Sequence, residues 1–473
     1  MKRLLFTVCF VLSLGTAFGQ NSIIVTEQNI HDSTKYSIIK EYRYPSTISC
    51  IQSDYNSSTF IYADQSVPLH AKEFTVPDLR VNDMIIKTIG VDGKRDTVYF
   101  CGRNLRNGLA TFGYFSVNDV FNGSGTVYLH NPFLSGEETL QIENLTRMVT
   151  FVNETGTHYA CIGTNENGKH CLVDLACDPF SNTWDYRAGT LIDGLETMFD
   201  IKKVYSMPRD YIVTSGIDSS MDGKYLSLRV YDPSDVFAAS GIQDIKHVFC
   251  IDTSFCIPWE KEDVLASNPK NNYIVTVSYI KSSAYYQIGQ RPWPSQSSLH
   301  IGVFNINMLV SGSLNSMVDN TVFEPLYFVD NNLNWLVEGP ENTLAFLETE
   351  THTAGYKTSA FSEVDFDASH KVCGIRLFQT PEEVYYGMDS YNVNRNYVIS
   401  GFKKDNRTML RFGMETFMSS KSCHPTDKYD FIHRNPYKSV NRTRPFVIKY
   451  RRSEFEGIRV FTDDVPQETI CEQ

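Results

Sequence analysis

Three short runs decide the fold: Tyr99-Phe100-Cys101-Gly102, then Gly108-Leu109-Ala110-Thr111-Phe112-Gly113-Tyr114-Phe115, then Thr126-Val127-Tyr128-Leu129. Each run is rich in aromatic and β-branched residues and is bounded by Gly, Asn or Asp, which is the pattern of a β-strand between turns. A less regular run, Met84-Ile85-Ile86-Lys87-Thr88, precedes them. Residues 84–129 are therefore predicted to form one small four-stranded sheet.

The first of these runs has counterparts along the chain, which we call anchors. The other anchors are Phe60-Ile61-Tyr62-Ala63, Tyr159-Ala160-Cys161-Ile162, Tyr211-Ile212-Val213-Thr214, Tyr273-Ile274-Val275-Thr276, Leu344-Ala345-Phe346-Leu347 and Tyr397-Val398-Ile399-Ser400. Their starting residues, 60, 99, 159, 211, 273, 344 and 397, are 39 to 71 residues apart. Helical periodicity is nearly absent, and residues 195–204 form the best apolar segment for a helix. A chain this long with one recurring unit predicts a repeated all-β architecture.

These repeated units resemble the blades of the β-propeller superfamily. The resemblance implies a single all-β ring of seven four-stranded blades over residues 20–473, because stacking blades around an axis buries both faces of every sheet. The signatures of WD40, kelch and sialidase blades are absent from the sequence. Two stacked β-sandwiches, or a ring of six or eight blades, are the alternatives. Residues 36–44 and 446–450 are the candidate strands for a shared closing blade.

The first residues predict an export signal. Lys2 and Arg3 precede an apolar run, residues 4–14, and Ala17 and Gly19 stand at the −3 and −1 positions of a cleavage site. The sequence thus predicts a signal peptide over residues 1–19 and a secreted protein, extracellular or periplasmic. No later segment reaches the roughly 18 apolar residues of a membrane span.

The charge balance disfavours polyanionic partners. Removing the two basic residues of the signal changes the formal charge from −12 to 41 − 55 = −14. Nucleic acids and anionic membranes are bound mainly through Lys and Arg, so neither is expected as a partner.

Ten cysteines remain after the signal is removed, an even number that fits an oxidising compartment. Cys161 and Cys171 flank a turn signal, residues 164–168, and are predicted to face each other across a hairpin as a disulfide. Cys250 and Cys256 close a short loop and are predicted to form a second disulfide. Buried free thiols are the alternative for all ten.

The longest departure from the strand pattern, between Tyr279 and Leu299, supplies the candidate ligand-binding residues. It contains Tyr285, Tyr286, Arg291 and Trp293 with two prolines. Rings with a nearby guanidinium suit the apolar faces of a sugar and are equally typical of protein-binding hot spots. The alternative is that these rings fold back and cap the propeller or form a mobile flap.

No motif for catalysis or for a cofactor is present. Glu348, Glu350 and His352 alternate along one predicted strand, with Glu363, Asp365 and Asp367 on the next. Neither group meets a strict ligand spacing, so no metal site is predicted. His130, His158 and His170 are expected to be structural.

The sequence therefore predicts a secreted propeller that binds an extracellular glycan or protein, with its catalytic residues, if any, unknown. Two alternatives stand beside this prediction. One is a glycan-active hydrolase or lyase on the same scaffold, with carboxylates at the mouth of the ring. The other is a structural surface-assembly protein. Because propellers host all three classes, the fold cannot choose between them.

Overall fold

The computed structural model describes the strands, the helices and the turns that join some of them. The described residues are 22–25, 36–43, 46–52, 56–64, 71–89, 95–123, 125–131, 133–134, 140–153, 156–178, 183–191, 195–206, 208–221, 223–233, 245–250, 264–268, 273–281, 297–314, 318–323, 328–338, 343–352, 357–367, 369–380, 383–391, 396–403, 408–412, 446–449 and 459–462.

The strands form seven sheets, numbered here in chain order. Sheet 1 contains β2 (Tyr36–Arg43), β3 (Ser46–Gln52), β4 (Ser57–Asp64) and β5 (Ala71–Pro77). Sheet 2 contains β6 (Leu79–Ile89), β7 (Arg95–Asn104), β8 (Ala110–Ser116) and β9 (Thr126–His130), followed by β31 (Arg459–Thr462). Sheet 3 contains β10 (Phe133–Leu134), β11 (Leu140–Asn153), β12 (Gly156–Asn165), β13 (His170–Asp178) and β14 (Thr183–Leu191). Sheet 4 contains β15 (Leu195–Ser206), β16 (Arg209–Met221), β17 (Gly223–Tyr231) and β18 (Ile245–Cys250).

The remaining three sheets follow the same order. Sheet 5 contains β19 (Val264–Asn268), β20 (Tyr273–Lys281), β21 (Ser297–Asn305) and β22 (Val318–Phe323). Sheet 6 contains β23 (Phe328–Glu338), β24 (Thr343–His352), β25 (Lys357–Phe366) and β26 (Val372–Thr380). Sheet 7 contains β27 (Glu383–Tyr391), β28 (Asn396–Lys403), β29 (Thr408–Phe412), β1 (Ser22–Val25) and β30 (Phe446–Lys449).

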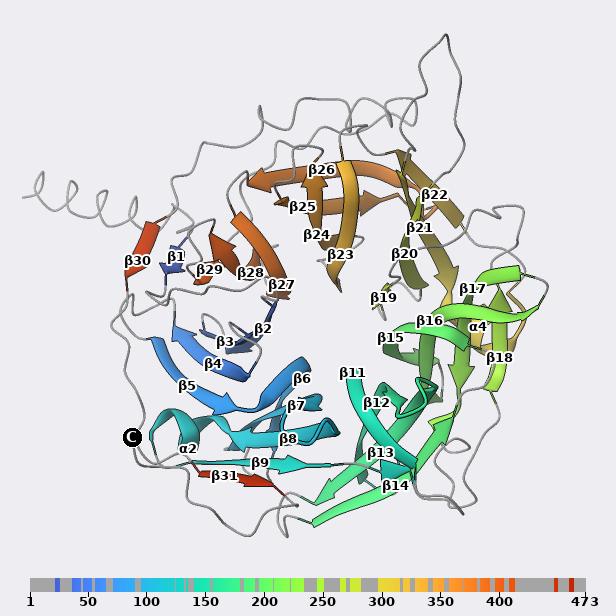
Figure 1. Ribbon diagram of the computed structural model, residues 1–473. Coiled ribbons are helices and arrows are strands. Elements are labelled where there is room, and N and C mark those ends of the chain that lie inside the picture. Colours follow the sequence, from blue (N-terminus) through green and yellow to red (C-terminus); the bar gives the residue numbers. More distant parts are fainter. Residues whose placement is uncertain are drawn as a thin grey trace, which may run out of the picture.

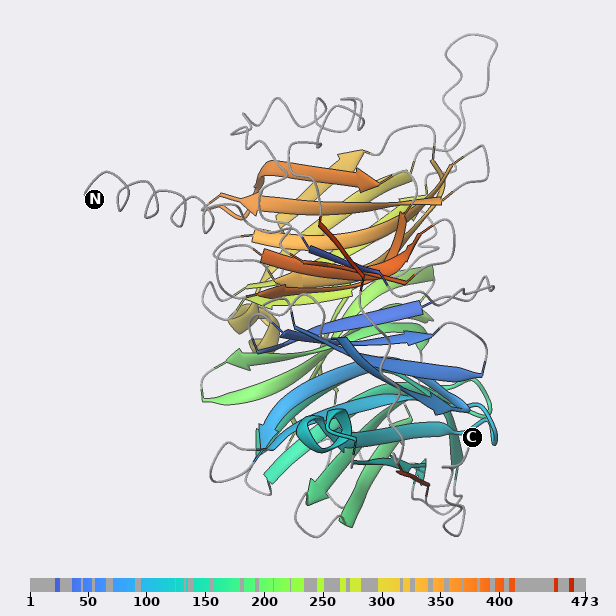
Figure 2. The same cartoon turned by 90° about the vertical axis from the view of Figure 1, so that its left-hand side faces the viewer.

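The seven sheets are arranged around one centre (Figure 1). The view turned by 90° shows that their strands run between the two faces of the ring (Figure 2). We call β2, β6, β11, β15, β19, β23 and β27, which lie nearest the centre, the inner strands. Each inner strand contacts the next, and β27 contacts β2. This arrangement confirms the prediction of an all-β propeller.

Helices are few and short in the described part of the chain. Only α2 (Val117–Phe121) and α4 (Ile306–Ser311) occur there, and neither is long and apolar enough to cross a membrane. Residues 195–204, the best helical segment of the sequence, lie within strand β15. Helix α2 follows β8 and buries Phe121 against Phe74 of sheet 1, at a ring-centroid distance of 5.4 Å.

The core lies between neighbouring sheets rather than inside any one of them. Phe60 of sheet 1 packs on Phe100 and Phe115 of sheet 2, with ring centroids 5.3 Å and 5.0 Å apart. Tyr99, on the opposite face of sheet 2, packs on Tyr159 of sheet 3 at 4.4 Å. Because side chains alternate along a strand, sheet 2 supplies one apolar face to sheet 1 and the other to sheet 3.

The alignment of anchors needs two corrections. Counted outward from the inner strand, Phe60 lies in β4, the third strand of its sheet, whereas the other six anchors begin in second strands. In addition, Tyr99 and Tyr159 face each other across one interface, so they are not equivalent positions. Bulky aromatic residues recur on both faces of these strands, so they could not mark one register.

Strand pairing at the two ends also differs from the expectation. Residues 36–44 and 446–450 were expected to share one sheet, but β2 pairs with β3 in sheet 1. Strand β30 instead pairs in parallel with β1, and β1 pairs antiparallel with β29. The partner of β30 is therefore β1, a shorter segment that precedes β2.

Candidate functional site

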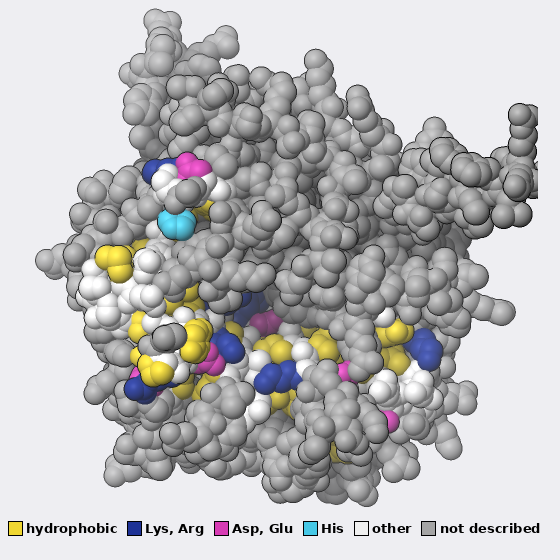
Figure 3. Space-filling view, turned by 180° about the vertical axis from the view of Figure 1, so that it is seen from behind, with side chains coloured by type: hydrophobic (Ala, Val, Ile, Leu, Met, Phe, Trp, Pro, Cys, Tyr) yellow, Lys and Arg dark blue, Asp and Glu magenta, His cyan; other side chains and the backbone are white. Residues whose placement is uncertain are grey.

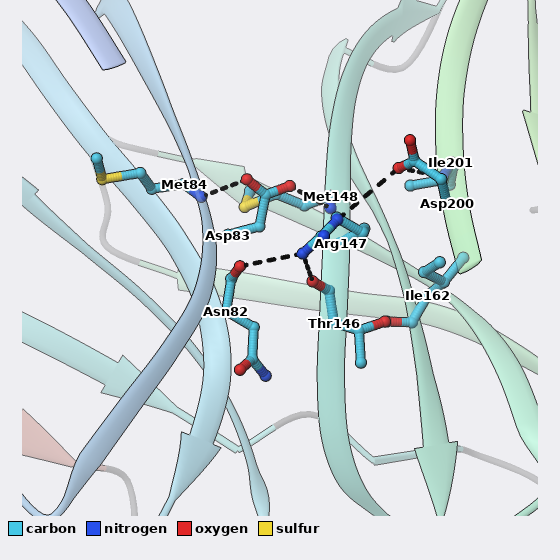
Figure 4. A network of polar contacts seen from close by, with 9 residues as sticks. All are labelled: Asn82, Asp83, Met84, Thr146, Arg147, Met148, Ile162, Asp200 and Ile201. Atoms are coloured by element: carbon cyan, nitrogen blue, oxygen red, sulfur yellow. Dashed lines mark hydrogen bonds and ion pairs between the residues drawn. The ribbon is translucent and has the colours of Figure 1, made fainter. Parts of the chain in front are cut away.

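A β-bulge recurs in the inner strands of sheets 2, 3 and 4. The pairing with the second strand skips Asn82 in β6, Thr146 in β11 and Phe199 in β15. A bulge redirects the side chains that follow it. The next residues are Asp83, Arg147 and Asp200, so three charged side chains occupy equivalent positions on three adjacent strands (Figure 4).

Glycine stands opposite each bulge. Gly102, Gly163 and Gly216 pair with the residue that precedes the bulge in sheets 2, 3 and 4. A Cβ at Gly102 would lie 1.8 Å from the carbonyl oxygen of Arg80, and one at Gly163 would lie 2.1 Å from that of Asn144. The bulged backbone thus leaves no room for a side chain at these positions.

Asp83 joins sheet 2 to sheet 3. Its Oδ1 accepts the backbone N–H of Met84 at 2.8 Å, and its Oδ2 accepts that of Met148 on β11 at 3.0 Å. Asp83 is 6% exposed. The two charge-assisted hydrogen bonds offset the cost of burying this carboxylate.

Asn82 makes a second connection between the same sheets. Its Nδ2 donates to Oδ1 of Asn144 at 2.7 Å and to the carbonyl oxygen of Leu145 at 2.6 Å. The Asn82 carbonyl oxygen accepts from Nη1 of Arg147 at 3.4 Å. The bulge residue that the strand ladder leaves unpaired is therefore bonded to the next sheet.

Arg147 extends the network to sheet 4. Its Nη1 also donates to the carbonyl oxygen of Thr146 at 3.2 Å, and its Nε lies 4.0 Å from Oδ1 of Asp200. Asp200 Oδ1 in turn accepts the backbone N–H of Ile201 at 2.8 Å, as Asp83 does from Met84. We call Asn82, Asp83, Arg147 and Asp200 the rim network; it connects the inner strands of three sheets.

The rim network is suited to holding sheets together rather than to acid–base catalysis. Asp83 and Asp200 both act as acceptors of backbone N–H groups, a role that the ionised carboxylate fills. Arg147 lies between them and interacts with Asp200. Both oxygens of Asp83 are engaged by backbone N–H groups, and Oδ1 of Asp200 accepts one and faces Arg147, so the pair does not resemble the acid and nucleophile of a glycosidase.

Lys87 lies on the same face of β6 as Asp83, four residues further along the strand. Its Nζ is 5.6 Å from the centroid of the Tyr159 ring on β12, a cation–π distance. Burial lowers the pKa of the Lys87 amine, and the charge of Lys203 on β15 lowers this pKa further. Within the described part of the chain no carboxylate forms an ion pair with Lys87, whereas Lys203 lies 3.4 Å from Oδ2 of Asp210.

Charged side chains are visible on the face of the ring that Figure 3 shows. Among the described residues, Lys and Arg side chains lie beside Asp and Glu side chains along one side of the recess in this face. The described surface near the centre is therefore mixed in charge.

His158 forms a buried pair with Asp174. Its Nδ1 lies 2.9 Å from one carboxylate oxygen of Asp174 and 3.0 Å from the other, and the two side chains are 2% and 0% exposed. The imidazole stacks on Phe151 at 5.0 Å. No substrate can reach this pair, so the expectation of a structural histidine fits His158. His130 is likewise buried and stacks on Tyr114 at 5.9 Å.

The predicted Cys161–Cys171 disulfide is wrong. Both residues are buried free thiols. Cys161 pairs with Val173 and Cys171 with Gly163, so the two cysteines are diagonal neighbours. Diagonal Cα atoms in a hairpin lie about 7–8 Å apart, beyond the reach of a disulfide. The turn was recognised correctly, but the register is shifted by two residues from the one that the bond needs.

Other predicted residues lie outside the part of the chain that the structure describes. These residues are Tyr285, Tyr286, Arg291, Trp293, Cys256 and the signal segment 1–19. The binding surface, the Cys250–Cys256 disulfide and the signal peptide therefore stay predictions.

The two acidic groups of the sequence, residues 348–352 and 363–367, lie at opposite ends of one hairpin. In sheet 6, Glu350 pairs with Thr358, whereas Asp365 pairs with Thr343 at the far end of β24. Asp367 follows β25, where its Oδ1 accepts the backbone N–H of Ser369 at 2.8 Å and that of Lys371 at 2.9 Å. The hydrogen bond from the Ser369 hydroxyl lowers the pKa of Asp367 most, and the two backbone hydrogen bonds lower it further. This carboxylate shapes a turn, and among the described residues no three His, Cys, Asp or Glu side chains gather around a possible metal position.

Sequence reasoning missed the rim network. Asp83, Arg147 and Asp200 differ in type, so no residue pattern connects them. The glycines opposite the bulges were the available signal. They follow Tyr99, Tyr159 and Tyr211 by three, four and five residues, so an alignment on tyrosine concealed them.

Comparisons with known proteins return similar folds and no relative in sequence. The sequence matches no protein-family model and no curated protein. Among solved structures, the β-propeller domain of the Trilobed protease from Pyrococcus furiosus has 10% identity and a TM-score of 0.41, with 82% of this chain and 96% of that chain covered. Drosophila Plexin A in complex with Semaphorin 1b has 9% identity and a TM-score of 0.40, with 83% and 88% covered. The GH93 α-L-arabinofuranosidase of Fusarium graminearum, in complex with arabinobiose, has 9% identity and a TM-score of 0.40, with 83% and 97% covered. Similarities this low assign no function, and the chain is a β-propeller by its own strand arrangement.

Proposed function

We propose that the protein is exported and binds an extracellular glycan or protein ligand that carries an acidic group. The single observation behind this proposal is the half-buried Lys87 amine above the Tyr159 ring. The amine offers a contact for a carboxylate or sulfate, whereas the buried Tyr159 ring packs against its side chain from within the protein.

The electrostatics of Lys87 support an anionic ligand. Burial and the charge of Lys203 both disfavour the protonated amine, as its lowered pKa records. An anion bound beside Lys87 would favour the protonated form and offset the repulsion from Lys203. The binding energy would then come partly from an interaction that the free protein lacks.

Binding is favoured over hydrolysis. The alternative of a glycan-active enzyme needs two carboxylates with separate acid and base or nucleophile roles. Asp83 and Asp200 are the carboxylates of the rim network, and both are engaged with backbone N–H groups. They therefore act as parts of the scaffold in this proposal.

Export is supported by the pattern of residues 1–19 and by the even number of cysteines that follows it. N-terminal sequencing of the secreted protein tests this part. Cleavage after Gly19 is the expected result, whereas a mature chain that begins at Met1 would remove the basis for an extracellular ligand.

A glycan-array screen of the exported protein tests the choice of ligand. The array should carry matched neutral glycans, glycans with uronic acids and sulfated glycans. We expect retention on acidic members only. Retention on neutral members alone would contradict the role of Lys87, and no retention on any member would point to a protein ligand with acidic side chains.

The aromatic segment supplies a second, independent set of proposed ligand contacts, and Trp293→Ala tests it. If the indole contacts ligand, the substitution weakens binding by about 1–3 kcal/mol and leaves the Tm nearly unchanged. If Trp293 instead caps the ring, the substitution costs several kcal/mol of stability, as for any buried aromatic. A large fall in Tm would thus contradict the recognition role of this residue.

A further inference from the structure

Three cysteines meet in the interface between sheets 2 and 3. Cys101 on β7, Cys161 on β12 and Cys171 on β13 belong to one apolar cluster, and each is 0% exposed. All three are free thiols. The thiols are thus gathered from two sheets into one region from which water is excluded.

Cys101 and Cys161 are matched across this interface. Tyr99 and Tyr159 precede them by two residues in each strand, and their rings pack at a centroid distance of 4.4 Å. Side chains two residues apart lie on the same face of a strand, so Cys101 points toward sheet 3 and Cys161 toward sheet 2. Strands β7 and β12 are both second strands of their sheets, so a step of two residues carries both chains in the same direction.

Cys161 also affects the titration of its two neighbours. Burial raises the pKa of Cys101, and a side-chain hydrogen bond with Cys161 raises this pKa further. Burial raises the pKa of Cys171 to about 12, with a smaller contribution from the charge of Cys161. Cys161 is therefore the central thiol of the three, and Cys101 is the one that bonds to it.

We propose that Cys101 and Cys161 form a disulfide that joins sheets 2 and 3 when the protein folds in an oxidising compartment. The two thiols lose two protons and two electrons as the S–S bond forms, and a thiol–disulfide oxidant of that compartment is reduced from its disulfide to its dithiol form. A disulfide between two sheets packed face to face is a known arrangement, as in immunoglobulin domains.

The timing of the reaction follows from burial. The thiolate is the reactive form, and burial disfavours it. The folded, reduced protein is therefore slow to oxidise, and the bond forms as the two sheets come together during folding. The inference rests on the proposed export, because a reducing compartment would leave both thiols free.

Peptide mapping without reductant tests the inference on the full mature chain. The chain is directed by an unrelated signal sequence into an oxidising compartment, so that the result does not depend on the function of residues 1–19. The purified protein is unfolded in iodoacetamide and digested. We expect a peptide pair that links Cys101 to Cys161, and an alkylated Cys171.

Two results would overturn the inference: complete alkylation of Cys101 and Cys161, or a link between Cys161 and Cys171. Cys171→Ala is the matched control, because it removes a thiol of the same cluster and should leave the link intact. Cys161→Ala should leave Cys101 alkylated. Ligand binding does not enter the measurement, so failure of the proposed ligand would leave this result unaffected.

Stability gives a second measurement, made on the Cys250→Ala variant so that the predicted Cys250–Cys256 disulfide does not contribute. This variant produced in a reducing compartment should have the Cys101 and Cys161 thiols free and a Tm lower by about 5 °C than the same variant from the oxidising compartment, from the usual effects of a disulfide on stability and of stability on Tm. Equal Tm values together with a mapped link would show a strained bond, whereas equal values without a link would overturn the inference.

Discussion

Asp83 shows how one side chain can connect two sheets. Its carboxylate accepts one N–H from its own strand and one from β11, so it satisfies one backbone donor on the inner strand of each sheet. Buried donors that lack a partner are costly, which makes the carboxylate a structural requirement rather than a spare charge.

The substitution Asp83→Ala should therefore destabilise the protein by about 2 kcal/mol, since hydrogen bonds to charged groups are worth about 1.5–3 kcal/mol. Glu143→Ala is the control, because Glu143 is about half exposed and its oxygen lies 3.9 Å from Nη2 of Arg103. Exposed pairs contribute about 0–1 kcal/mol. Thermal unfolding of both variants checks the order, and an equal effect would show that the contacts of Asp83 carry no special weight.

Asp367 contributes to the loss of folding stability at low pH. Its pKa is lowered in the folded protein, so it contributes stability above the pKa of the unfolded chain and loses it as pH falls through the folded pKa. Asp367→Asn should reduce the difference in Tm between pH 6 and pH 2. An unchanged difference would mean that the turn bonds of Asp367 do not affect unfolding.

The bulge and its facing glycine form the repeating element of sheets 2, 3 and 4. The bulge residue, the charged residue after it and the glycine on the second strand keep the same relation in all three sheets. Sheet 7 keeps the glycine, since Gly401 pairs with Tyr385 before the shift. The element is thus defined by backbone geometry rather than by one side chain.

Substitutions at two glycines of the same hairpin compare the cost of steric crowding with the cost of backbone strain. Gly163→Ala would place a Cβ against the Asn144 carbonyl and should cost about 3 kcal/mol or more. Gly168→Ala meets no atom within 4 Å but must keep a φ of +70°, which costs about 1–2 kcal/mol. We expect the lower Tm for Gly163→Ala. The reverse order would contradict the role given to the facing glycine.

The sequence predicted the type of most elements and missed their register. Alternating apolar residues and turn signals located strands such as β7, β8 and β9, because these depend on local pattern. The position of Phe60 in a third strand, and the diagonal relation of Cys161 and Cys171, depend on which strands pair and in which register. Pairing across a sheet is a long-range property that single residues do not encode.

At the scale of the molecule, β1 connects the two ends of the chain. Ile23 and Ile24 pair with Arg411 and Leu410 of β29, and on the other side with Val447 and Ile448 of β30. A strand between two others has both of its edges bonded. Residues 22–25 are thereby part of sheet 7, next to the sheet where the chain continues with β2.

Ile24→Pro tests this role of β1. Proline removes one ladder N–H and is tolerated essentially at sheet edges, so the substitution should cost about 3 kcal/mol and expose sheet 7 to proteases. Ile24→Val is the control and should leave both properties nearly unchanged. If Ile24→Pro has the same Tm and protease resistance as the control, then β1 does not hold the ring together.

The most direct test of the proposed function compares Lys87→Met with Lys169→Met on the same glycan array. Both variants lose one positive charge, but Lys169 lies in the exposed turn between β12 and β13, away from the Tyr159 ring. We predict that Lys87→Met weakens retention on acidic glycans at least tenfold, in the range of about 1–3 kcal/mol for a contact residue, while Lys169→Met stays within twofold of the unaltered protein. Equal retention by the two variants would contradict the proposal that Lys87 contacts the ligand.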